Sequence, residues 1–291
     1  MPSLLRRYKN AKAERRKAEK RRDFFTQGQL PWSEGYAEHK VAEITRALTA
    51  GHFGQGDLAA GYGFRLDERI IEYPWLFSRL PKSPGLMLDA GSVLNFSYLL
   101  QHPALEAKKL HICTLAPEAD CFWSKGVSYI FADLRKLPYR DCLFDWVVCL
   151  STIEHVGMDN TMLYSEKSQK ESNPDDFVIA VRELRRVLKP GGTAYFSVPF
   201  GQQANLGWQQ IFNQKKVEQL ICAFEPCHRS FDYFYYHPLG WQRSNAPECA
   251  TATVFDIHHA KGYDADFAAA ARAVCCLELK KGGSSLPAPE V

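Results

Sequence analysis

Polar residues that could do chemistry directly follow apolar stretches at three places in the middle of the chain. Asp89 and Gly91 follow the first such stretch, Asp133 follows the second, and Glu154 with His155 follows the third. Ligands of open parallel sheets bind where the strands end, so these residues are candidates for a binding site. A histidine can accept a proton near neutral pH, so His155 and Glu154 are candidate catalytic residues. The alternative is that both only anchor their loop through hydrogen bonds.

The elements around these residues predict an α/β fold. Residues 175–188 predict a helix with Asn173 as its N-cap, because apolar residues recur there at helical spacing and Pro190-Gly191-Gly192 follows them. Strand and helix signals alternate along this part of the chain, which predicts a doubly wound, mostly parallel sheet with crossover helices. The expected strands are 86–88, 110–113, 127–132, 144–150, 193–198, 230–236 and 275–279, and the other expected helices are 4–25, 215–224 and 267–274.

Four segments that carry these residues, in this order, resemble the class I S-adenosylmethionine-dependent methyltransferases, in particular the broad small-molecule group called type 11. The resemblance covers residues 86 to about 200. It implies an enzyme that uses S-adenosylmethionine and a Rossmann-like, mostly parallel seven-stranded sheet, preceded here by an N-terminal helical cap. The matching segments are Leu86–Ser92, Ala132–Tyr139, Phe144–Val156 and Glu183–Gly192.

The resemblance also implies roles for single residues. Asp89 would lie near the amino group of the cofactor's methionyl half, and Asp133 would accept a hydrogen bond from the exocyclic amine of adenine. Ser151 would line the site where the sulfonium methyl faces the acceptor. The transfer is a direct displacement at that methyl, which requires alignment and, for a hydroxyl acceptor, removal of a proton. The cofactor-binding residues expected in this way are Asp89, Ala90, Gly91, Ser92, Asn95, Thr114, Leu115, Asp133, Leu134, Ser151 and Thr152.

Two departures from the family pattern concern cofactor binding. The glycine-rich loop has fewer glycines than usual, and Ser92 and Asn95 stand where small residues are expected. After the second strand, where the family usually has an acid for the ribose hydroxyls, this chain has Cys113–Pro117. Either Glu118 reaches back to the ribose, or Thr114 and backbone groups hold it. The same gap weakens a nicotinamide-dinucleotide alternative, which also requires an acid there.

The acceptor side is the least patterned part of the sequence. The long polar segment 157–173 follows the fourth core strand and can cover the acceptor. Tyr73, Trp208 and Trp241 are candidates for the wall of an acceptor pocket, with packing in the core as the alternative. No group of metal-ligating residue types has the spacing of a metal site, so we expect no metal.

Composition divides the chain into a basic end and a mildly acidic body. The net charge is +3, but residues 1–22 hold ten basic and two acidic side chains (+8), and the rest hold 26 basic and 31 acidic (−5). The basic end favours a solvated helix or an anionic partner. Nine cysteines without metal or redox spacing, and no apolar stretch of membrane-spanning length, predict a cytoplasmic protein without a transmembrane segment. The expected domains are a basic tail or helix over 1–30, a helical cap over 31–85, an S-adenosylmethionine-binding domain over 86–281 and a disordered tail over 282–291.

Three functions are compatible with these observations. The leading hypothesis is methyl transfer from S-adenosylmethionine to a small-molecule acceptor, at a hydroxyl oxygen of a sugar or glycan precursor or of a secondary metabolite. The second is a non-catalytic scaffold, which the missing glycines and the missing ribose acid would permit. The third is an RNA methyltransferase whose basic residues 1–22 hold phosphates. The acidic body and the lack of an Asn-Pro-Pro-Tyr-type motif disfavour this third hypothesis.

Overall fold

The structure is a computed structural model of the chain, and it divides into two compact units. The cap unit comprises residues 1–78, 236–242 and 255–271, and the sheet unit comprises 79–235, 243–254 and 272–291. The residues that the structure describes are 4–51, 53–54, 56–161, 170–256, 258–268 and 270–283. Most of the expected C-terminal tail and the middle of the 157–173 segment lie outside the described residues.

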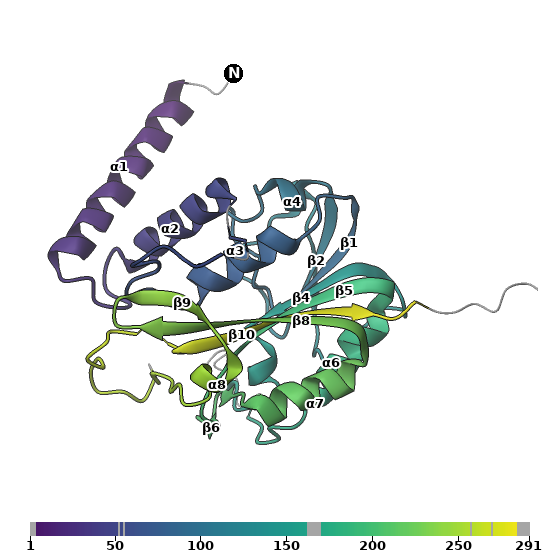
Figure 1. The fold of residues 1–291 in the computed structure, drawn as a ribbon. Helices are drawn as coiled ribbons and strands as arrows, with labels where there is room; N and C mark the ends of the chain where they lie inside the picture. Colours follow the sequence, from purple (N-terminus) through teal and green to yellow (C-terminus); the bar gives the residue numbers. More distant parts are fainter. Residues whose placement is uncertain are drawn as a thin grey trace, which may run out of the picture. The chain divides into compact units, whose positions relative to one another are not determined.

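One large sheet contains most of the strands, in the order β3-β2-β1-β4-β5-β10-β8-β9 (Figure 1). The first five strands along the chain pair in parallel, and β10 is antiparallel to both of its neighbours. The strand order reverses between β1 and β4, which is where open α/β sheets bind ligands. The strands are β1 (Gly85–Ala90), β2 (Lys108–Thr114), β3 (Ser128–Phe131), β4 (Phe144–Leu150), β5 (Leu188–Pro199), β8 (Pro226–His237), β9 (Gly240–Ser244) and β10 (Ala273–Lys281).

The doubly wound α/β fold is confirmed, but the sheet has eight strands where we expected seven. The extra strand is β9, at the end of the strand order. Its segment Gly240–Ser244 contains one large apolar residue, Trp241, so it carries no alternating pattern that could have predicted a strand. The structure also adds a separate two-stranded sheet of β6 (Ala204–Asn205) and β7 (Gln210–Ile211).

The alanine-rich helix expected over 267–274 is wrong. Phe267 has a left-handed backbone (φ 51°), and β10 begins at Ala273. Alanine has the highest helix propensity, but propensity is a small effect per residue. The last two residues of this segment belong to β10, which lies between two antiparallel strands, and Val274 pairs with Pro199 of β5 and Phe234 of β8. Pairing on both sides therefore overrides the local preference.

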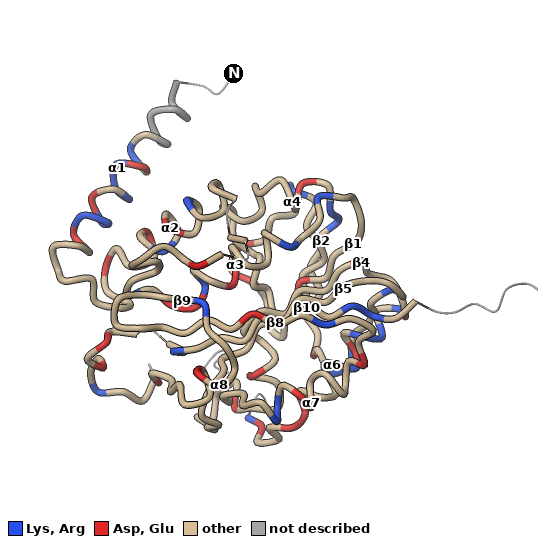
Figure 2. The backbone as a smooth tube through the Cα atoms, viewed as in Figure 1, with Lys and Arg blue, Asp and Glu red and all other residues tan. Residues whose placement is uncertain are grey.

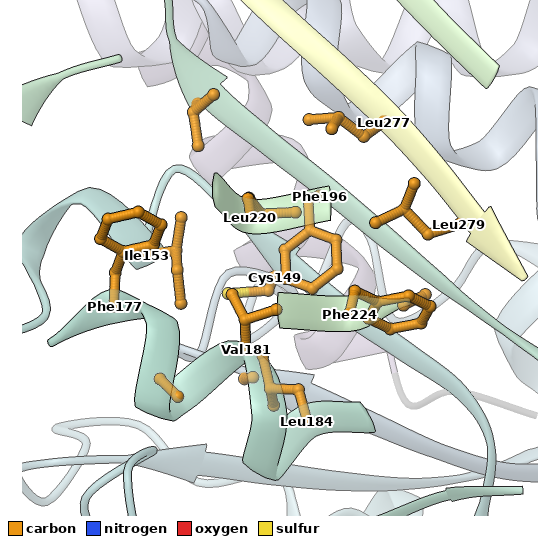
Figure 3. Close-up of a cluster of buried hydrophobic side chains, with 14 of the residues drawn as sticks. Cys149, Ile153, Phe177, Val181, Leu184, Phe196, Leu220, Phe224, Leu277 and Leu279 are labelled. Carbon is orange, nitrogen blue, oxygen red and sulfur yellow. The ribbon is translucent and has the colours of Figure 1, made fainter. Parts of the chain in front are cut away.

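Two helices of the sheet unit bury apolar faces in its main core (Figure 3). Val181 and Leu184 of α6 (Phe177–Val187) and Leu220 of α7 (Gln214–Phe224) are fully buried in one cluster with Phe196 of β5. Burying a side chain of this size stabilises the fold by about 1.5–3 kcal/mol. Both helices are confirmed at the positions expected from their spacing.

The expected N-cap of α6 is wrong. The residue before the helix is Asp176, not Asn173, and its side chain forms no capping hydrogen bond. The Asp176 carboxylate instead accepts a hydrogen bond from Arg135 (2.8 Å). The Asp176 carboxylate thus binds a distant partner that the local pattern cannot reveal and does not cap the helix.

The cap unit contains three long helices. They are α1 (Leu4–Thr26), which confirms the expected N-terminal helix, α2 (Tyr36–Ala50) and α3 (Arg69–Arg79). Tyr36 donates from its hydroxyl to Asp67 (3.0 Å), which ties α2 to the segment before α3. Among the described residues, no helix combines the length and the apolar character that crossing a membrane requires. The short helices in the described part of the chain include α4 (Pro103–Glu106), α8 (Ala246–Cys249), η1 (Trp123–Lys125) and η2 (Ile153–His155).

Candidate functional site

The carboxyl ends of β1 to β4 lie at one edge of the sheet, because these strands are parallel. Ala90 at the end of β1 is level with Cys113 of β2, and Thr114 is level with Phe131 of β3. The amide of Gly91 donates to the Cys113 carbonyl (2.8 Å), so the first loop leaves the sheet beside β2. The structure therefore brings together the loops that carry the predicted cofactor residues.

Gly91 is the point where the loop after β1 meets the loop after β4. Its φ is +116°, and a Cβ on it would lie 2.2 Å from the Thr152 hydroxyl oxygen. Thr152 is held in place because its hydroxyl donates to the Leu150 carbonyl (2.9 Å). Only glycine satisfies both the backbone angle and the close approach.

Ser92 continues this turn and carries a polar group without a partner. Its backbone is left-handed (φ 62°). Its hydroxyl oxygen is buried, and it makes no hydrogen bond to any residue that the structure describes. Leaving a buried hydroxyl unpaired costs about 1–3 kcal/mol, so a polar ligand group at this turn would recover that free energy.

The Asp89 carboxylate fixes the same loop through hydrogen bonds to its backbone. Asp89 is fully buried, and its two oxygens accept from the amides of Val93 (3.1 Å) and Leu94 (2.8 Å). Such bonds fix the path of the backbone at Gly91 and Ser92. In the structure Asp89 therefore shapes the loop, and its predicted contact with an amino group stays a prediction.

Asn95 connects this loop to the segment between β2 and β3. Its amide nitrogen donates to the carbonyl of Asp120 (2.9 Å), and its side-chain oxygen accepts from the Tyr129 hydroxyl (2.8 Å). The Tyr129 oxygen in turn accepts from the amide of Phe122 (2.8 Å). Asn95 is thus a bridge between two loops of the site, and its direct contact with the cofactor is untested.

Asp133 follows β3 and forms an ion pair that the sequence analysis missed. The Arg135 guanidinium donates to both oxygens of Asp133 (2.6–3.1 Å), to both oxygens of Glu171 (2.7 and 2.8 Å) and to one oxygen of Asp176 (2.8 Å). One guanidinium therefore joins three carboxylates from two separate parts of the chain. Arg135, two positions after Asp133, could have indicated the contact between these two residues. Nothing in the local sequence indicates the contacts of Arg135 with Glu171 and Asp176.

The electrostatics of this network keep Asp133 ionised. Partial burial alone would raise the pKa of Asp133, but hydrogen bonds from Arg135 and its charge outweigh burial and lower it. The hydrogen bonds to Asp133 and Glu171 raise the pKa of Arg135. Three N–H groups of Arg135, on its backbone amide, Nε and Nη2, donate to Asp133, whose carboxylate has about four lone-pair sites. Arg135 therefore takes up much of the acceptor capacity of Asp133, and the predicted contact with the adenine amine stays a prediction.

The loop after β4 is held by β5 on one side. Ser151 has φ 38°, and its amide donates to both the carbonyl and the hydroxyl oxygen of Ser197 (3.0 Å each). This strained turn starts the short helix η2, which carries Glu154 and His155. Backbone strain of this kind is common at functional sites.

His155 is oriented by Trp208, which lies in the β6–β7 turn. The Nδ1 atom of His155 is 3.0 Å from the Trp208 carbonyl oxygen, and the two rings lie 5.3 Å apart at 31°. A carbonyl only accepts, so Nδ1 carries the hydrogen and, in the neutral ring, Nε2 carries the lone pair. The buried Glu154 lies with Oε1 3.9 Å from Nε2. The structure thus joins the two predicted catalytic residues with one predicted aromatic residue.

The other predicted residues have different surroundings. Thr114 and Leu134 are buried in the sheet unit, and Leu115 is half-buried. Tyr73 and Trp241 belong to the cap unit, where both are buried, and the Trp241 indole donates to the carbonyl of Leu66 (2.9 Å). Their role in an acceptor pocket stays a prediction.

Cysteines and metal-ligating groups do not form a second centre in the described parts of the chain. All nine cysteines are free. Burial raises the pKa of Cys113, which lies beside the site, to about 12, so its thiol stays neutral and unreactive. Within the described ranges, no three His, Cys, Asp or Glu side chains gather as a metal site.

Part of the chain matches a known family of protein domains. A family model described as "Methyltransferase domain" matches residues 90–196. The mouse protein named "Probable tRNA methyltransferase 9B" is 24% identical over 166 residues, which are 55% of this chain and 34% of the mouse protein. The chain therefore spans about a third of the length of this relative.

Solved structures of methyltransferases also resemble the chain loosely. One is the 1,6-didemethyltoxoflavin-N1-methyltransferase of Burkholderia thailandensis, with 14% identity and a TM-score of 0.42 over 87% of this chain and 92% of that chain. Another is the N-methyltransferase NodS of Bradyrhizobium japonicum with S-adenosyl-L-homocysteine, with 14% identity and a TM-score of 0.41 over 83% of this chain and 98% of that chain.

The sheet order defines a Rossmann-like fold, and the loops at its carboxyl edge lie at the switch point, where such sheets bind ligands. The matched model covers β2, β3 and β4 and the loops that carry Gly91, Asp133 and His155. Residues 90–196 therefore match a methyltransferase domain, in agreement with the resemblance to the class I S-adenosylmethionine-dependent methyltransferases.

The residues present fit this cofactor at the turn after β1. The glycine backbone at Gly91 permits close approach, and the buried, unpaired Ser92 hydroxyl offers a hydrogen-bonding group there. The usual ribose acid is missing after β2, and the buried Thr114 stands at that strand end instead. The turn after β1 can therefore accept a polar ligand group, and its assignment to the methionyl half and the binding of the ribose stay predictions.

Proposed function

We propose that this methyltransferase acts on a hydroxyl group of a small-molecule acceptor and that His155 removes the hydroxyl proton. The observation that carries the proposal is the hydrogen bond from His155 Nδ1 to the Trp208 carbonyl (3.0 Å). It leaves Nε2 as the proton-accepting atom of the neutral ring. A hydroxyl acceptor needs such a base, whereas a neutral amine attacks without one.

The surroundings of His155 support this role. The Glu154 carboxylate, 3.9 Å from Nε2, stabilises positive charge on the ring after proton uptake. Trp208 fixes the ring from the other side through its carbonyl and its own indole ring. When bound, the cofactor supplies an electrophilic methyl group, and the turn at Gly91 and Ser92 would hold its methionyl half.

The test separates cofactor binding from methyl transfer. Binding of S-adenosylhomocysteine is measured by calorimetry, and transfer of label from S-adenosylmethionine is measured into a fractionated metabolite extract. We expect His155→Gln to change the dissociation constant by less than about threefold while transfer falls by about 10²–10⁴-fold, the usual size of a general-base contribution.

The matched control is His228→Gln, which alters an exposed histidine of β8 and should leave both measurements unchanged. Undiminished transfer by His155→Gln would exclude His155 as the base. Parallel loss of binding and transfer would assign His155 to the structure of the site instead.

A nucleotide of RNA is the second candidate acceptor. The relative named as a probable tRNA methyltransferase and the +8 charge of residues 1–22 favour it. The same labelling experiment distinguishes the two acceptors, because label would enter the RNA fraction and would disappear from it after ribonuclease treatment.

A further inference from the structure

Helix α1 carries a basic surface that the methyl-transfer site does not use. Its 23 residues hold ten basic and three acidic side chains. Every residue from 11 to 19 is exposed, and Figure 2 shows basic residues distributed along this part of the helix. Nine residues of α-helix span about 13 Å, so this stretch presents a short, charged rod to solvent.

The acidic side chains of this stretch are already paired within the helix. Glu14 accepts from Lys17 (2.9 Å), and Glu19 accepts from Arg15 (3.2 Å). Lys12 and Arg16 have no ion pair with any residue that the structure describes, and they lie one turn apart on the same face. The unbalanced positive charge is therefore concentrated on that face.

The opposite end of α1 is firmly attached to α2 within the cap unit. Phe24 is fully buried, and its ring contacts the rings of Tyr36 (5.9 Å) and His39 (5.4 Å). Gly35 permits this crossing, because a Cβ there would lie 2.1 Å from the carbonyl oxygen of Lys20. The basic stretch is thus extended from a packed anchor and is not a loose tail.

The composition of the exposed stretch decides the kind of partner. Between Lys9 and Asp23 its apolar residues are three alanines, so no stripe exists to enter a bilayer or to fill the groove of a protein. Protein interfaces also depend on buried aromatic or aliphatic anchors, which this stretch lacks. The kind of partner that remains is one recognised by charge alone, with closely spaced phosphates.

We propose that α1 binds the phosphate backbone of nucleic acid, with Lys12 and Arg16 as its principal contacts. The binding is independent of sequence, because helix residues that contact phosphates carry no base information. The proposal holds whichever acceptor the enzyme methylates, since it concerns a surface of the cap unit alone.

The experiment titrates the full-length protein into a fluorescein-labelled 20-nucleotide oligouridylate at several salt concentrations. We expect tight binding at low salt and a steep loss as salt rises. For the variant K12Q/R16Q we expect the dissociation constant to rise roughly 10- to 30-fold near 0.1 M salt, and the log–log salt slope to fall by about 1.4, since each lost contact to a single strand removes about 0.7. Glutamine keeps helix propensity, which circular dichroism verifies.

The matched control is K109Q/K215Q, which removes the same charge from exposed positions of the sheet unit. Equal weakening by both pairs would overturn the proposal in favour of diffuse attraction by the whole chain. No oligouridylate binding at 20 mM salt would also overturn it, as would binding to phosphatidylserine vesicles in its place. Weakening confined to K12Q/R16Q would support it.

Discussion

Asp133 occupies the sheet edge where the resemblance implies an adenine-binding acid, yet its carboxylate already accepts from three N–H groups of Arg135. The donor atoms are the backbone amide, Nε and Nη2 of Arg135, at 2.6–3.1 Å. The same guanidinium holds Glu171 and Asp176, so Asp133 contributes to fixing the chain before α6. Its effect on the cofactor site is therefore expected to pass through Arg135.

This arrangement makes a prediction about specificity. We expect Asp133→Asn to lower the free energy of unfolding by about 1–2 kcal/mol, because it weakens charge-assisted hydrogen bonds. Arg135→Gln should have a similar effect, and the double variant should show less than the sum of the two. The preference for S-adenosylhomocysteine over its inosine analogue, which lacks the exocyclic amine, should stay the same in Asp133→Asn.

Calorimetry with the two cofactor analogues and urea unfolding provide these measurements. If Asp133→Asn removed the preference for the adenine amine, Asp133 would be the adenine acceptor after all. Additive losses of stability would show that the Asp133–Arg135 pair is not a unit.

At the residue scale, the sequence located the strand ends around the candidate site but not the partners of its residues. Apolar runs followed by Asp89, Asp133 and His155 located the strand ends, because a buried parallel strand must be apolar throughout. The partner of His155 is a backbone carbonyl, which any residue type supplies, so the pattern holds no trace of it. Glu171 and Asp176 lie about 40 residues from Arg135, and nothing local indicates that contact.

At the scale of the elements, the turn after β1 depends on Gly91. An alanine there meets both an unfavourable φ of +116° and a contact of 2.2 Å with Thr152. We expect Gly91→Ala to destabilise the fold by about 1–3 kcal/mol and to weaken S-adenosylhomocysteine binding more than tenfold, because the strain moves the loop. Thermal unfolding and calorimetry measure the two effects.

Gly126→Ala is the matched control for this substitution. Gly126 also has a positive φ (+75°), but a Cβ there meets nothing within 4 Å. The Gly126→Ala variant should lose about 1 kcal/mol of stability and keep its affinity for S-adenosylhomocysteine. Equal loss of affinity in both variants would show that the close approach to Thr152 is unimportant.

The contact between α1 and α2 responds to pH through His39. Burial lowers the pKa of His39, and Arg21 and Arg46 lower it further against the opposing charge of Glu43. A base with a lowered pKa in the folded state binds protons more readily when unfolded, so stability is full above the unfolded value of about 6.5 and falls with decreasing pH. We expect His39→Gln to reduce the loss of stability between pH 7.5 and 5.

Urea unfolding of the wild type and of His39→Gln at both pH values isolates this contribution, since the other titrating groups are common to both proteins. His102→Gln serves as a comparison at a histidine of the sheet unit whose pKa burial also lowers. An identical pH response of wild type and His39→Gln would show that His39 stays neutral in both states.

Elements with strong periodicity or a continuous apolar run were predictable, and very short or patternless strands were not. The apolar face of α6 appears directly in the spacing of Phe177, Val181 and Leu184. The first two residues of β10 were predicted as helix because they follow an alanine-rich segment, but pairing with two flanking strands overrules that local preference. The β6–β7 pair has two residues in each strand, too few for any pattern, although it carries Trp208 beside His155.

At the scale of the whole molecule, charge and chemistry occupy different parts of the chain. Residues 1–22 hold +8 and the remaining residues −5, so the average of +3 describes neither. The loops from Asp89 to His155 that form the candidate cofactor site all belong to the sheet unit, whereas α1 belongs to the cap unit. The difference in charge between the two parts could be predicted from the sequence, because counting charged residues does not depend on which residues are in contact.

The separation predicts that the two activities can be removed independently. Deleting residues 1–19 removes the exposed part of α1 but retains Phe24, which packs against Tyr36 and His39. We expect this deletion to leave the dissociation constant of S-adenosylhomocysteine within about twofold, since the lost charges attract at long range only and salt screens them. Oligouridylate binding should fall to the level of K12Q/R16Q or below. Calorimetry and fluorescence titration on the same preparation make the comparison direct, and a tenfold loss of cofactor affinity after the deletion would show that α1 supports the catalytic site.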